Sequence, residues 1–418
     1  MDRRTLFKGI AGAGIAAALP LGSDLAADRP ALVDLAAGAK PISRAERIDR
    51  ISRLQAQLRK TGLGAILIEA GSSLDYFTAI QWWRSERMTA AVIPADGELV
   101  VITPFFEAPS IKEMLDVPAS IRTWDEHESP MALVAGWLRE RKLGARRLAL
   151  EETVREFIRD GLQKAMPRAV IVSGADQVRA VRMRKTAAEL ALMQVANTIT
   201  LNAMNHASAR IQKGMTPADI VALIVAATRK QGGNADDGLV LLGEAAAYPH
   251  GSHQKQDVRE GEVVLMDCGC QVHGYTSDIS RTIVLGEPSV ELRKVWAHVR
   301  QGQQIVMETA KVGVECGAVD DAVRLHYESL GYGPGYKLPG LSHRTGHGIG
   351  MDGHEPVNLV HLEKTRMDVG MCFSNEPGIY LPGKFGVRLE DCFYMTAGGP
   401  RLFTELAPSI GDVFGLGA

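Results

Sequence analysis

The sequence predicts an α+β protein in two parts: a smaller N-terminal α/β part, and a larger part in which strands follow long helices. Three observations predict this class. The 418 residues are enough for two domains. Strand and helix patterns alternate up to about residue 182, as in an α/β domain. Beyond that point two long helical patterns come first, and strand patterns with single acidic residues follow. We expect a signal and linker over 1–40, an α/β domain over 41–182 and a second domain over 183–418.

The first 40 residues resemble an export signal. Arg3 and Arg4 precede an apolar run, rich in Gly and Ala, from Gly9 to about Leu21. The run is shorter than the ~20 apolar residues that a membrane-spanning helix needs. Paired arginines are typical of the twin-arginine pathway, which exports folded proteins. We therefore expect export to the periplasm and no stable membrane span after signal removal.

The signal has two candidate cleavage positions. They follow Ala27 and Ala39, and Ala37-Gly38-Ala39 fits the small-x-small pattern better. The alternative for the whole segment is an ordinary amphipathic N-terminal helix.

The N-terminal part shows strand patterns at 64–68, 90–94, 98–102 and 147–151. Ala95-Asp96-Gly97 is a turn signal that joins the second and third of these as a hairpin. Helical patterns lie at 42–57, 131–141 and 154–166.

The C-terminal part opens with a helical pattern over about 186–212, whose apolar face is expected to be Leu190, Met193, Val195, Ala196 and Ile199. A second helix is expected to begin at Thr216-Pro217, because Thr is a good N-cap and Pro suits the first helical position. Two more helical patterns lie near 290–312 and 319–330.

Composition excludes several classes of protein. The formal net charge is −2, which argues against binding to nucleic acid or to an anionic membrane. The five cysteines show neither the paired spacing of a zinc module nor an even number for disulfides. We expect them to be buried core residues.

Two strand patterns near the middle of the chain each carry one aspartate. Asp267 interrupts the apolar pattern 262–269, and Asp278 lies in the middle of the pattern 275–284 after the turn His273-Gly274. Strands joined by so short a turn pair antiparallel, so the two carboxylates are expected to approach each other. Burying them unpaired is unfavourable, and a cation removes that penalty.

The same arrangement recurs near the C-terminus with two glutamates. Glu376 ends the pattern 371–376, and Glu390 follows the turn at 382–384 on the next strand. Side chains alternate along a strand, so Arg388 and Glu390 share a face while Asp391 points away. Glu390 is therefore the candidate ligand, and the alternative to a catalytic role for Arg388 is an ordinary ion pair with Glu390 or Asp391.

Between these patterns lies His347, with Gly346 and Gly348 on either side, which let the backbone approach a ligand. Four carboxylates and one imidazole suit two divalent metal ions, most simply manganese, with cobalt, zinc or iron as alternatives. Charge balance agrees, since four carboxylates neutralise two doubly charged ions. The expected ligands are Asp267, Asp278, His347, Glu376 and Glu390.

These segments resemble the metal-binding motifs of the creatinase/prolidase/aminopeptidase P family of M24-type metallopeptidases. The resemblance covers about residues 45–415 and rests on five segments: 266–269, 275–282, 346–350, 375–380 and 386–391. It implies a pita-bread catalytic domain behind a creatinase-type N-terminal domain, and a homodimer. It further implies that Asp267 binds one ion, that Asp278 and Glu390 bridge the two, and that His347 and Glu376 complete the second site.

The resemblance also implies catalytic roles. A hydroxide between the two ions would be the nucleophile, and Glu376 would accept and pass on its proton. His354 matches the position that stabilises the tetrahedral intermediate, while His250 and His343 match positions beside the substrate. His253 is a weaker competitor of His250, and Arg388 completes the candidate set.

The most direct functional reading is a metallopeptidase that cleaves Xaa-Pro bonds, either a dipeptidase or an aminopeptidase P-like enzyme. The first alternative is a hydrolase or lyase of this fold that acts on a small non-peptide amide or related metabolite. The second is a non-catalytic binding protein. Prolidases hold the substrate carboxylate with an arginine upstream of the Glu376 strand, and the segment 361–366 offers only Arg366. Trp82 and Trp83 are expected in the core or at an interface.

Overall fold

The computed structural model describes residues 31–415. The expected twin-arginine signal and the cleavage position after Ala27 lie outside the described residues. From Leu32 onward the chain clusters as one compact unit, so the division near residue 183 stays a prediction. In the described part of the chain, no helix combines the length and the apolar character that crossing a bilayer requires.

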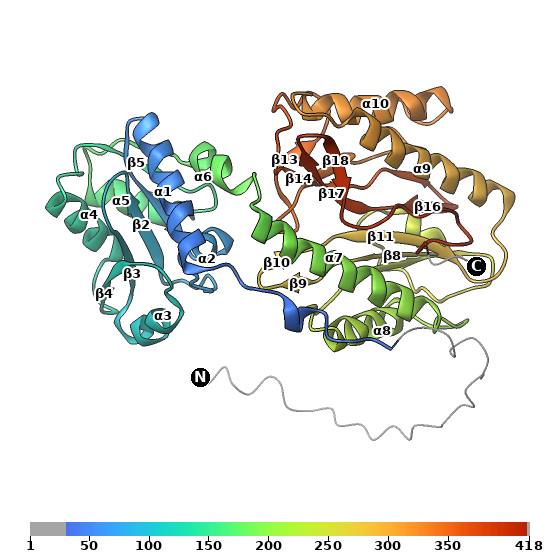
Figure 1. Ribbon diagram of the computed structural model, residues 1–418, viewed down its shortest axis with the longest axis horizontal. Helices are drawn as coiled ribbons and strands as arrows, with labels where there is room; N and C mark the ends of the chain where they lie inside the picture. The colour runs from blue at the N-terminus through green and yellow to red at the C-terminus, as the bar shows by residue number, and fades with distance from the viewer. Residues whose placement is uncertain (1–30, 416–418) are drawn as a thin grey trace, which may run out of the picture. The chain divides into compact units, whose positions relative to one another are not determined.

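A six-stranded sheet forms the N-terminal half (Figure 1), with its strands in the order β4-β3-β2-β1-β5-β6. The strands are β1 (Leu63–Glu69), β2 (Ala90–Pro94), β3 (Leu99–Pro104), β4 (Ala119–Trp124), β5 (Arg147–Leu150) and β6 (Ile171–Ser173). β2 and β3 form the predicted antiparallel hairpin, and β5 lies parallel to β1. The sequence pattern missed β4 and β6 because most of their side chains are only half-buried and show no clear alternation.

Helices cover this sheet. They are α1 (Arg44–Lys60), α2 (Ser72–Thr78), α3 (Ala108–Met114), α4 (Pro130–Glu140), α5 (Glu156–Ala165) and α6 (Ala175–Arg182). α1 begins at a capping box, in which Ser43 and Glu46 each accept the other's backbone N–H. α1, α4 and α5 were predicted. α2, α3 and α6 were missed because helices of seven or eight residues are too short to show a helical period.

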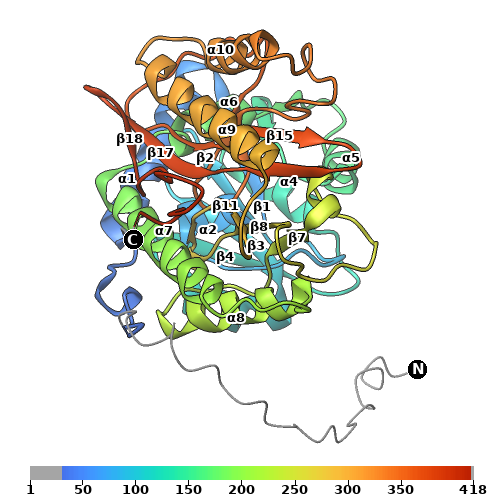
Figure 2. The ribbon, with the colours of Figure 1, turned by 90° about the vertical axis from the view of Figure 1, so that its right-hand side faces the viewer.

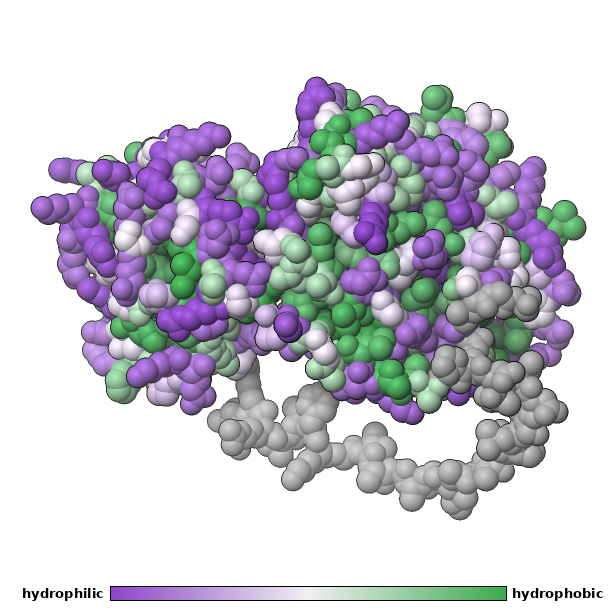
Figure 3. Space-filling model, in the orientation of Figure 1, coloured by the Kyte–Doolittle hydropathy of each residue, from purple (hydrophilic) through white to green (hydrophobic). Residues whose placement is uncertain are grey.

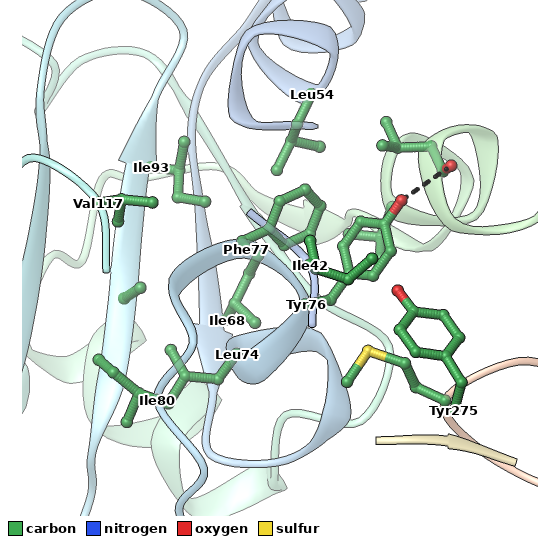
Figure 4. Packing of buried hydrophobic residues seen from close by; sticks show 14 of the residues in the cluster. Ile42, Leu54, Ile68, Leu74, Tyr76, Phe77, Ile80, Ile93, Val117 and Tyr275 are labelled. Atoms are coloured by element: carbon green, nitrogen blue, oxygen red, sulfur yellow. Dashed lines mark hydrogen bonds between the residues drawn. The ribbon is translucent and has the colours of Figure 1, made fainter. Parts of the chain in front are cut away.

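The central strand β1 packs on both faces. Ile66 and Ile68 join one core cluster, whereas Leu67 joins another that contains Trp137. Figure 4 shows the first cluster, in which Ile68 lies near Phe77 and below the helix that carries Leu54. Burial on both faces explains why the sequence shows a continuous apolar run here instead of an alternation.

Four helices frame the C-terminal half: α7 (Ala187–Ser208), α8 (Pro217–Lys230), α9 (Val290–Thr309) and α10 (Cys316–Ser329). All four were predicted. α7 begins at a capping box between Thr186 and Glu189, and α8 at one between Thr216 and Asp219 with Pro217 at the first position.

The strands of this half lie between the two helix pairs, with α7 and α8 on one side and α9 and α10 on the other (Figures 1 and 2). Three strands pair in the order β11-β8-β7 and five in the order β13-β12-β14-β17-β18, while β9 pairs with β10 and β15 with β16. The bounds are β7 (Leu239–Leu242), β8 (Val263–Cys268), β9 (Gln271–Val272), β10 (Tyr275–Thr276), β11 (Ile279–Val284), β12 (Gly346–Gly348), β13 (Glu355–Leu359), β14 (Cys372–Asn375), β15 (Gly378–Leu381), β16 (Phe385–Arg388), β17 (Asp391–Thr396) and β18 (Gly399–Leu402).

Only part of the predicted apolar face of α7 is buried in the core. Met193, Ala196 and Ile199 are buried as predicted, but Leu190 and Val195 are only half-buried. Figure 3 accordingly shows apolar residues gathered over α7 on the outer surface. All five cysteines are buried and unpaired, which confirms the expectation that they belong to the core.

Candidate metal centre

The first two acidic residues meet where β8 and β11 pair. Asp267 lies in β8 opposite Ser280 of β11. Asp278 lies in the break between β10 and β11, so the prediction that it lies within a strand is wrong. Ser277 stabilises this break, because its hydroxyl bonds to Thr200 at 2.8 Å and accepts the Cys270 N–H at 3.1 Å. The break frees the Asp278 side chain from the alternation of a strand, and it reaches Asp267.

Glu376 and Glu390 also occupy breaks between strands. Glu376 lies between β14 and β15, and Glu390 between β16 and β17. β14 pairs with β17 and β15 with β16, so the two ladders hold the breaks side by side. The backbone of Glu390 then bonds to Ser280, with its N–H 3.0 Å from the Ser280 carbonyl oxygen. This bridge joins the C-terminal strands to the Asp267 hairpin.

His347 lies on β12, opposite these carboxylates, and is 1% exposed. Its Nε2 lies 3.3 Å from Glu376, 3.7 Å from Asp278 and 4.0 Å from Glu390. Its Nδ1 lies 3.0 Å from the Gly348 carbonyl oxygen. A carbonyl oxygen can only accept, so Nδ1 carries the proton and Nε2 presents a lone pair to the carboxylates.

The structure therefore brings all five expected ligands together. One ligand atom from each of His347, Glu376 and Glu390 lies within 4.8 Å of the others, and the same holds for Asp267, Asp278 and Glu390. Glu390 belongs to both groups, which is the geometry of a shared ligand between two neighbouring sites.

Without a cation these contacts are mutually repulsive. Burial, and then the neighbouring carboxylates, raise the pKa values of Asp278 and Glu390 well above the ordinary range. Burial raises the pKa of Glu376 to about 7 and lowers that of His347 to about 3. Oε1 of Glu390 is buried and has no hydrogen-bond partner among residues 31–415. Oxygen ligands, a bare imidazole nitrogen and an unpartnered buried oxygen all fit divalent cations.

Arg388 is a buried cation beside this cluster, and it makes neither of the two ion pairs, with Glu390 or with Asp391, that were the alternative to a catalytic role. Its Nη2 bonds to Oδ2 of Asp267, and its Nε lies 3.1 Å from the Ser280 hydroxyl. Asp391 turns away and pairs with the fully buried Arg281 at 2.6 Å. The partner of Arg388 differs from that alternative because ion-pair partners are set by tertiary packing, whereas the alternation of side chains is local.

Three of the predicted histidines lie around the cluster. The ring of His354 meets that of His347 at a centroid distance of 4.2 Å. His343 is half-buried, with Nδ1 3.9 Å from Glu376. His250 is exposed, but it lies close enough to His343 and His354 to lower the pKa of both further. The carbonyl oxygen of Pro249, directly before it, accepts a hydrogen bond from Nη1 of Arg388 at 3.1 Å.

Two residues of the site were not predicted. The hydroxyl of Tyr380 lies 2.7 Å from Nε2 of His343 and accepts from Nη1 of Arg388 at 3.2 Å. Arg344 is half-buried, and it opposes the rise in the pKa of Glu376 and lowers that of His354. Tyr380 lies in the segment 375–380, which carries the family resemblance, and Arg344 directly follows His343. These positions are the only sequence signal that points to the two residues.

Arg366 and the two tryptophans do not belong to the group of residues around the five expected ligands. The side chain of Arg366 is 68% exposed and lies 3.5 Å from Glu315. Trp82 and Trp83 stack at 4.7 Å, and Trp83 is 69% exposed, so Trp83 is not a core residue. Together they line an open cavity of about 630 Å³ that also touches Gly274.

Known proteins resemble this chain over most of its length. The model of metallopeptidase family M24 matches residues 191–397, and that of the Creatinase/Prolidase N-terminal domain matches residues 50–184. An uncharacterized peptidase from Schizosaccharomyces pombe is 34% identical over 363 residues, which cover 82% of this chain and 78% of that protein. A Xaa-Pro dipeptidase from Lactobacillus delbrueckii subsp. lactis is 29% identical over 86% of this chain and 98% of its own length.

Solved structures agree. Dipeptidase PepE from Mycobacterium ulcerans matches with a TM-score of 0.80 at 28% identity, over 88% of this chain and 97% of that one. The predicted fold class, a pita-bread catalytic domain behind a creatinase-type domain, is confirmed.

Proposed function

This chain belongs to metallopeptidase family M24, and we propose that it is a Xaa-Pro dipeptidase that works with two divalent metal ions. The observation that carries the metal centre is the convergence of Asp267, Asp278, His347, Glu376 and Glu390 on one point, with an oxygen of Glu390 left unpartnered among the described residues. When bound, two such ions lower the pKa of a water molecule and polarise the scissile carbonyl group. Manganese is the metal we propose, with cobalt, zinc and iron as alternatives.

Glu376 is placed to move the proton. Its Oε1 accepts from the Ser374 hydroxyl at 3.2 Å and faces His347. This arrangement leaves Oε2, 3.9 Å from His343, as the atom that takes a proton from water and returns it to the proline nitrogen of the leaving group. The backbone N–H of Glu376 donates to the Thr345 carbonyl at 3.0 Å, so the residue is held at both ends.

The histidines would act as neutral groups. Burial lowers the pKa of His343 to about 3 and also lowers that of His354. Nδ1 of His343 donates to the Arg344 carbonyl oxygen at 2.7 Å, so its Nε2 accepts from Tyr380. His354, which has a ring nitrogen within 4.8 Å of ligand atoms of Asp278 and His347, is the group that would donate to the developing oxyanion. His250 lies on the same side and would contact the substrate.

The preference for a dipeptidase rests on Arg344. Its guanidinium makes no hydrogen bond or ion pair with any residue in the range 31–415. It lies beside Glu376 and His354, where the C-terminal carboxylate of a dipeptide would provide the missing partner. An aminopeptidase acting on longer peptides would instead need an open path past this arginine.

Turnover of a small peptide panel tests the proposal. The full chain, loaded in turn with each candidate metal, should release proline from Ala-Pro and Leu-Pro. No turnover of any Xaa-Pro peptide would refute it and favour the second candidate, a hydrolase or lyase of this fold acting on a small non-peptide amide or related metabolite. Metal analysis should find two ions for each chain.

We also propose that the enzyme is a homodimer exported by the twin-arginine pathway to the periplasm. Arg3-Arg4 and the short apolar run after them support export. Replacing both arginines by lysine should leave the protein in the cytoplasm on cell fractionation. Sedimentation of the purified protein should give twice the chain mass, and a monomer would contradict the proposed assembly.

A further inference from the structure

His354 is the last residue of a loop, and no described residue of the site forms a hydrogen bond with its side chain. The loop runs from Ile349 to His354, between β12 and β13. The His354 side chain makes no hydrogen bond to any described residue; its ring packs against that of His347, and one of its ring nitrogens lies within 4.8 Å of ligand atoms of Asp278 and His347. The position of the imidazole is therefore set by the backbone of this loop.

Glu355, directly after His354, binds the backbone of the loop with its side chain. Glu355 is 6% exposed, and its Oε1 accepts the backbone N–H of Met351 at 3.0 Å and that of Asp352 at 3.3 Å. The carboxylate of Glu355 thus holds two amides in the middle of the loop. The backbone of Glu355, the first residue of β13, fixes the end of the loop at His354.

Two cations from outside the loop hold that carboxylate. Arg182, the last residue of α6, donates to Oε1 of Glu355 at 2.7 Å, and Lys185 donates to Oε2 at 2.8 Å. Arg182 also reaches Asp352 at 3.0 Å, and the Ser72 hydroxyl donates to the same carboxylate at 2.6 Å. The loop is therefore bound to α2 and α6, the helices that pack on the N-terminal sheet.

The backbone of the loop packs closely on the ion pair of Lys185 and Glu355 at Gly350. A Cβ atom on Gly350 would lie 2.7 Å from Cε of Lys185 and 2.8 Å from both carboxylate oxygens of Glu355. A side chain at this position would displace the ion pair, so only glycine lets the loop lie directly on it. The carbonyl of Gly350 accepts from Thr276 at 2.8 Å, two residues before Asp278.

We infer that Glu355, held between Arg182 and Lys185, is a positioning residue that sets the place of His354 in the active site. The inference rests on the proposed function, because His354 matters only if the cluster acts on a carbonyl group. A buried carboxylate between two cations has one well-defined position, and removing one partner leaves an uncompensated charge that the loop must move to solvate. A displacement of about 1 Å at a catalytic group can lower the rate about 100-fold.

The test compares two buried glutamates in the full-length, metal-loaded protein. Glu355→Gln keeps the shape of the side chain and removes its charge. Glu69→Gln is the matched control, since Glu69 is also buried, accepts the backbone N–H of Arg155 at 3.1 Å and pairs with its guanidinium, but lies in the N-terminal sheet. The measurements are kcat and KM for Leu-Pro, metal content, and hydrogen exchange at the amides of Met351 and Asp352.

We expect Glu355→Gln to lower kcat about 100-fold with KM changed less than about threefold, metal content unchanged and faster exchange at both amides. Glu69→Gln should change none of these beyond about twofold. Equal kcat and equal exchange in the two variants would overturn the inference. If Glu355→Gln does not fold, Arg182→Met should show the same losses, and Arg182→Lys should recover most of them.

The design separates the two failures. If the unsubstituted protein hydrolyses no Xaa-Pro peptide, the proposed function fails, and hydrogen exchange together with the NMR signals of the His354 ring still decides whether Glu355 holds the loop. If the unsubstituted protein is active and Glu355→Gln is equally active, only the inference about Glu355 fails.

Discussion

Arg388 donates from Nη2 to Oδ2 of Asp267 across 121 positions of the chain, and this bond ties the segment of Glu390 to β8. The same guanidinium reaches the Ser280 hydroxyl, which in turn donates to Oε2 of Glu390 at 2.8 Å. Arg388 thus orients one expected ligand directly and a second through Ser280. Groups that orient metal ligands in this way contribute strongly to affinity and activity.

Arg388→Met should therefore weaken metal binding by about 10- to 100-fold, because Asp267 loses its charged partner while the volume of the side chain is nearly kept. Isothermal titration with manganese measures the change. Arg155→Met is the control, since Arg155 pairs with the buried Glu69 in the N-terminal sheet. If both variants bind manganese as the unsubstituted protein does, Arg388 has no role in orienting the ligands.

Metal affinity should rise with pH through about 7. In the metal-free protein burial raises the pKa of Glu376 to about 7, and burial with neighbouring carboxylates raises those of Asp278 and Glu390 well above their usual range. Carboxylates that hold protons must release them to bind a cation, so acid opposes binding. Titration calorimetry at pH 6.5 in buffers of different ionisation enthalpy should show proton release, and an identical heat in all buffers would contradict it.

The raised pKa values of these three carboxyl groups also determine how the stability of the metal-free protein changes with pH. A carboxyl group whose pKa is raised in the folded state stabilises the fold while protonated, and this stability is lost as pH rises through the folded value. Above pH 7, His343 and His347 are neutral in both states and contribute nothing. The metal-free protein should therefore lose thermal stability between pH 7 and pH 8, whereas the manganese-loaded protein should not; melting curves at the two pH values check both.

Arg344→Ala should raise KM for dipeptides selectively. Loss of a charge-assisted hydrogen bond of about 1.5–3 kcal/mol corresponds to about a 10- to 100-fold loss in kcat/KM for Leu-Pro. Leu-Pro amide, which lacks the carboxylate, should be affected far less. Arg366→Ala is the matched control, because Arg366 lies at the surface beside Glu315. Equal losses on both substrates would exclude Arg344 as the carboxylate partner.

The parts of this site that sequence predicts are those set by local rules. The cap residues Thr186 and Thr216 mark their helices, and the alternation rule names Glu390 as the ligand in preference to Asp391, although Glu390 lies in the break between β16 and β17. The break at Asp278 was not predictable in this way, because it depends on Ser277 bonding to Thr200 of a distant helix. The motif segments nevertheless name the correct aspartate, since the residue type is required whatever the local backbone.

Long-range partners were the least predictable feature. Glu355 follows His354 in the sequence and offers no periodic signal, and its role becomes visible only when Arg182 and Lys185 lie beneath it. Arg182 lies at the expected boundary between the two domains, yet its side chain is only 11% exposed. Ion pairs between segments more than 100 positions apart are fixed by the packing of whole elements, and no window of sequence contains that information.

The residues just before the N-terminal helix are the last testable feature. Leu35 and Ala36 donate backbone N–H groups to the Gln231 carbonyl at 3.0 and 3.2 Å, at the end of α8. Asp34 lies against Gly232, where a Cβ would come within 2.3 Å of its Oδ1. The segment is therefore part of the folded catalytic half, although signal cleavage after Ala39 would remove it.

A chain that begins at residue 40 should be less stable than one that begins at residue 31 by about 1–3 kcal/mol, because it loses these two hydrogen bonds and the apolar contacts of Leu35 and Ala36. Urea unfolding of the two manganese-loaded chains measures the difference. If the proposed export signal is cleaved, cleavage before Leu32 keeps these contacts, and the mass of the mature protein should then place its N-terminus near residue 28. A mature protein that begins at residue 40 and is as stable as the longer chain would show that this segment contributes nothing.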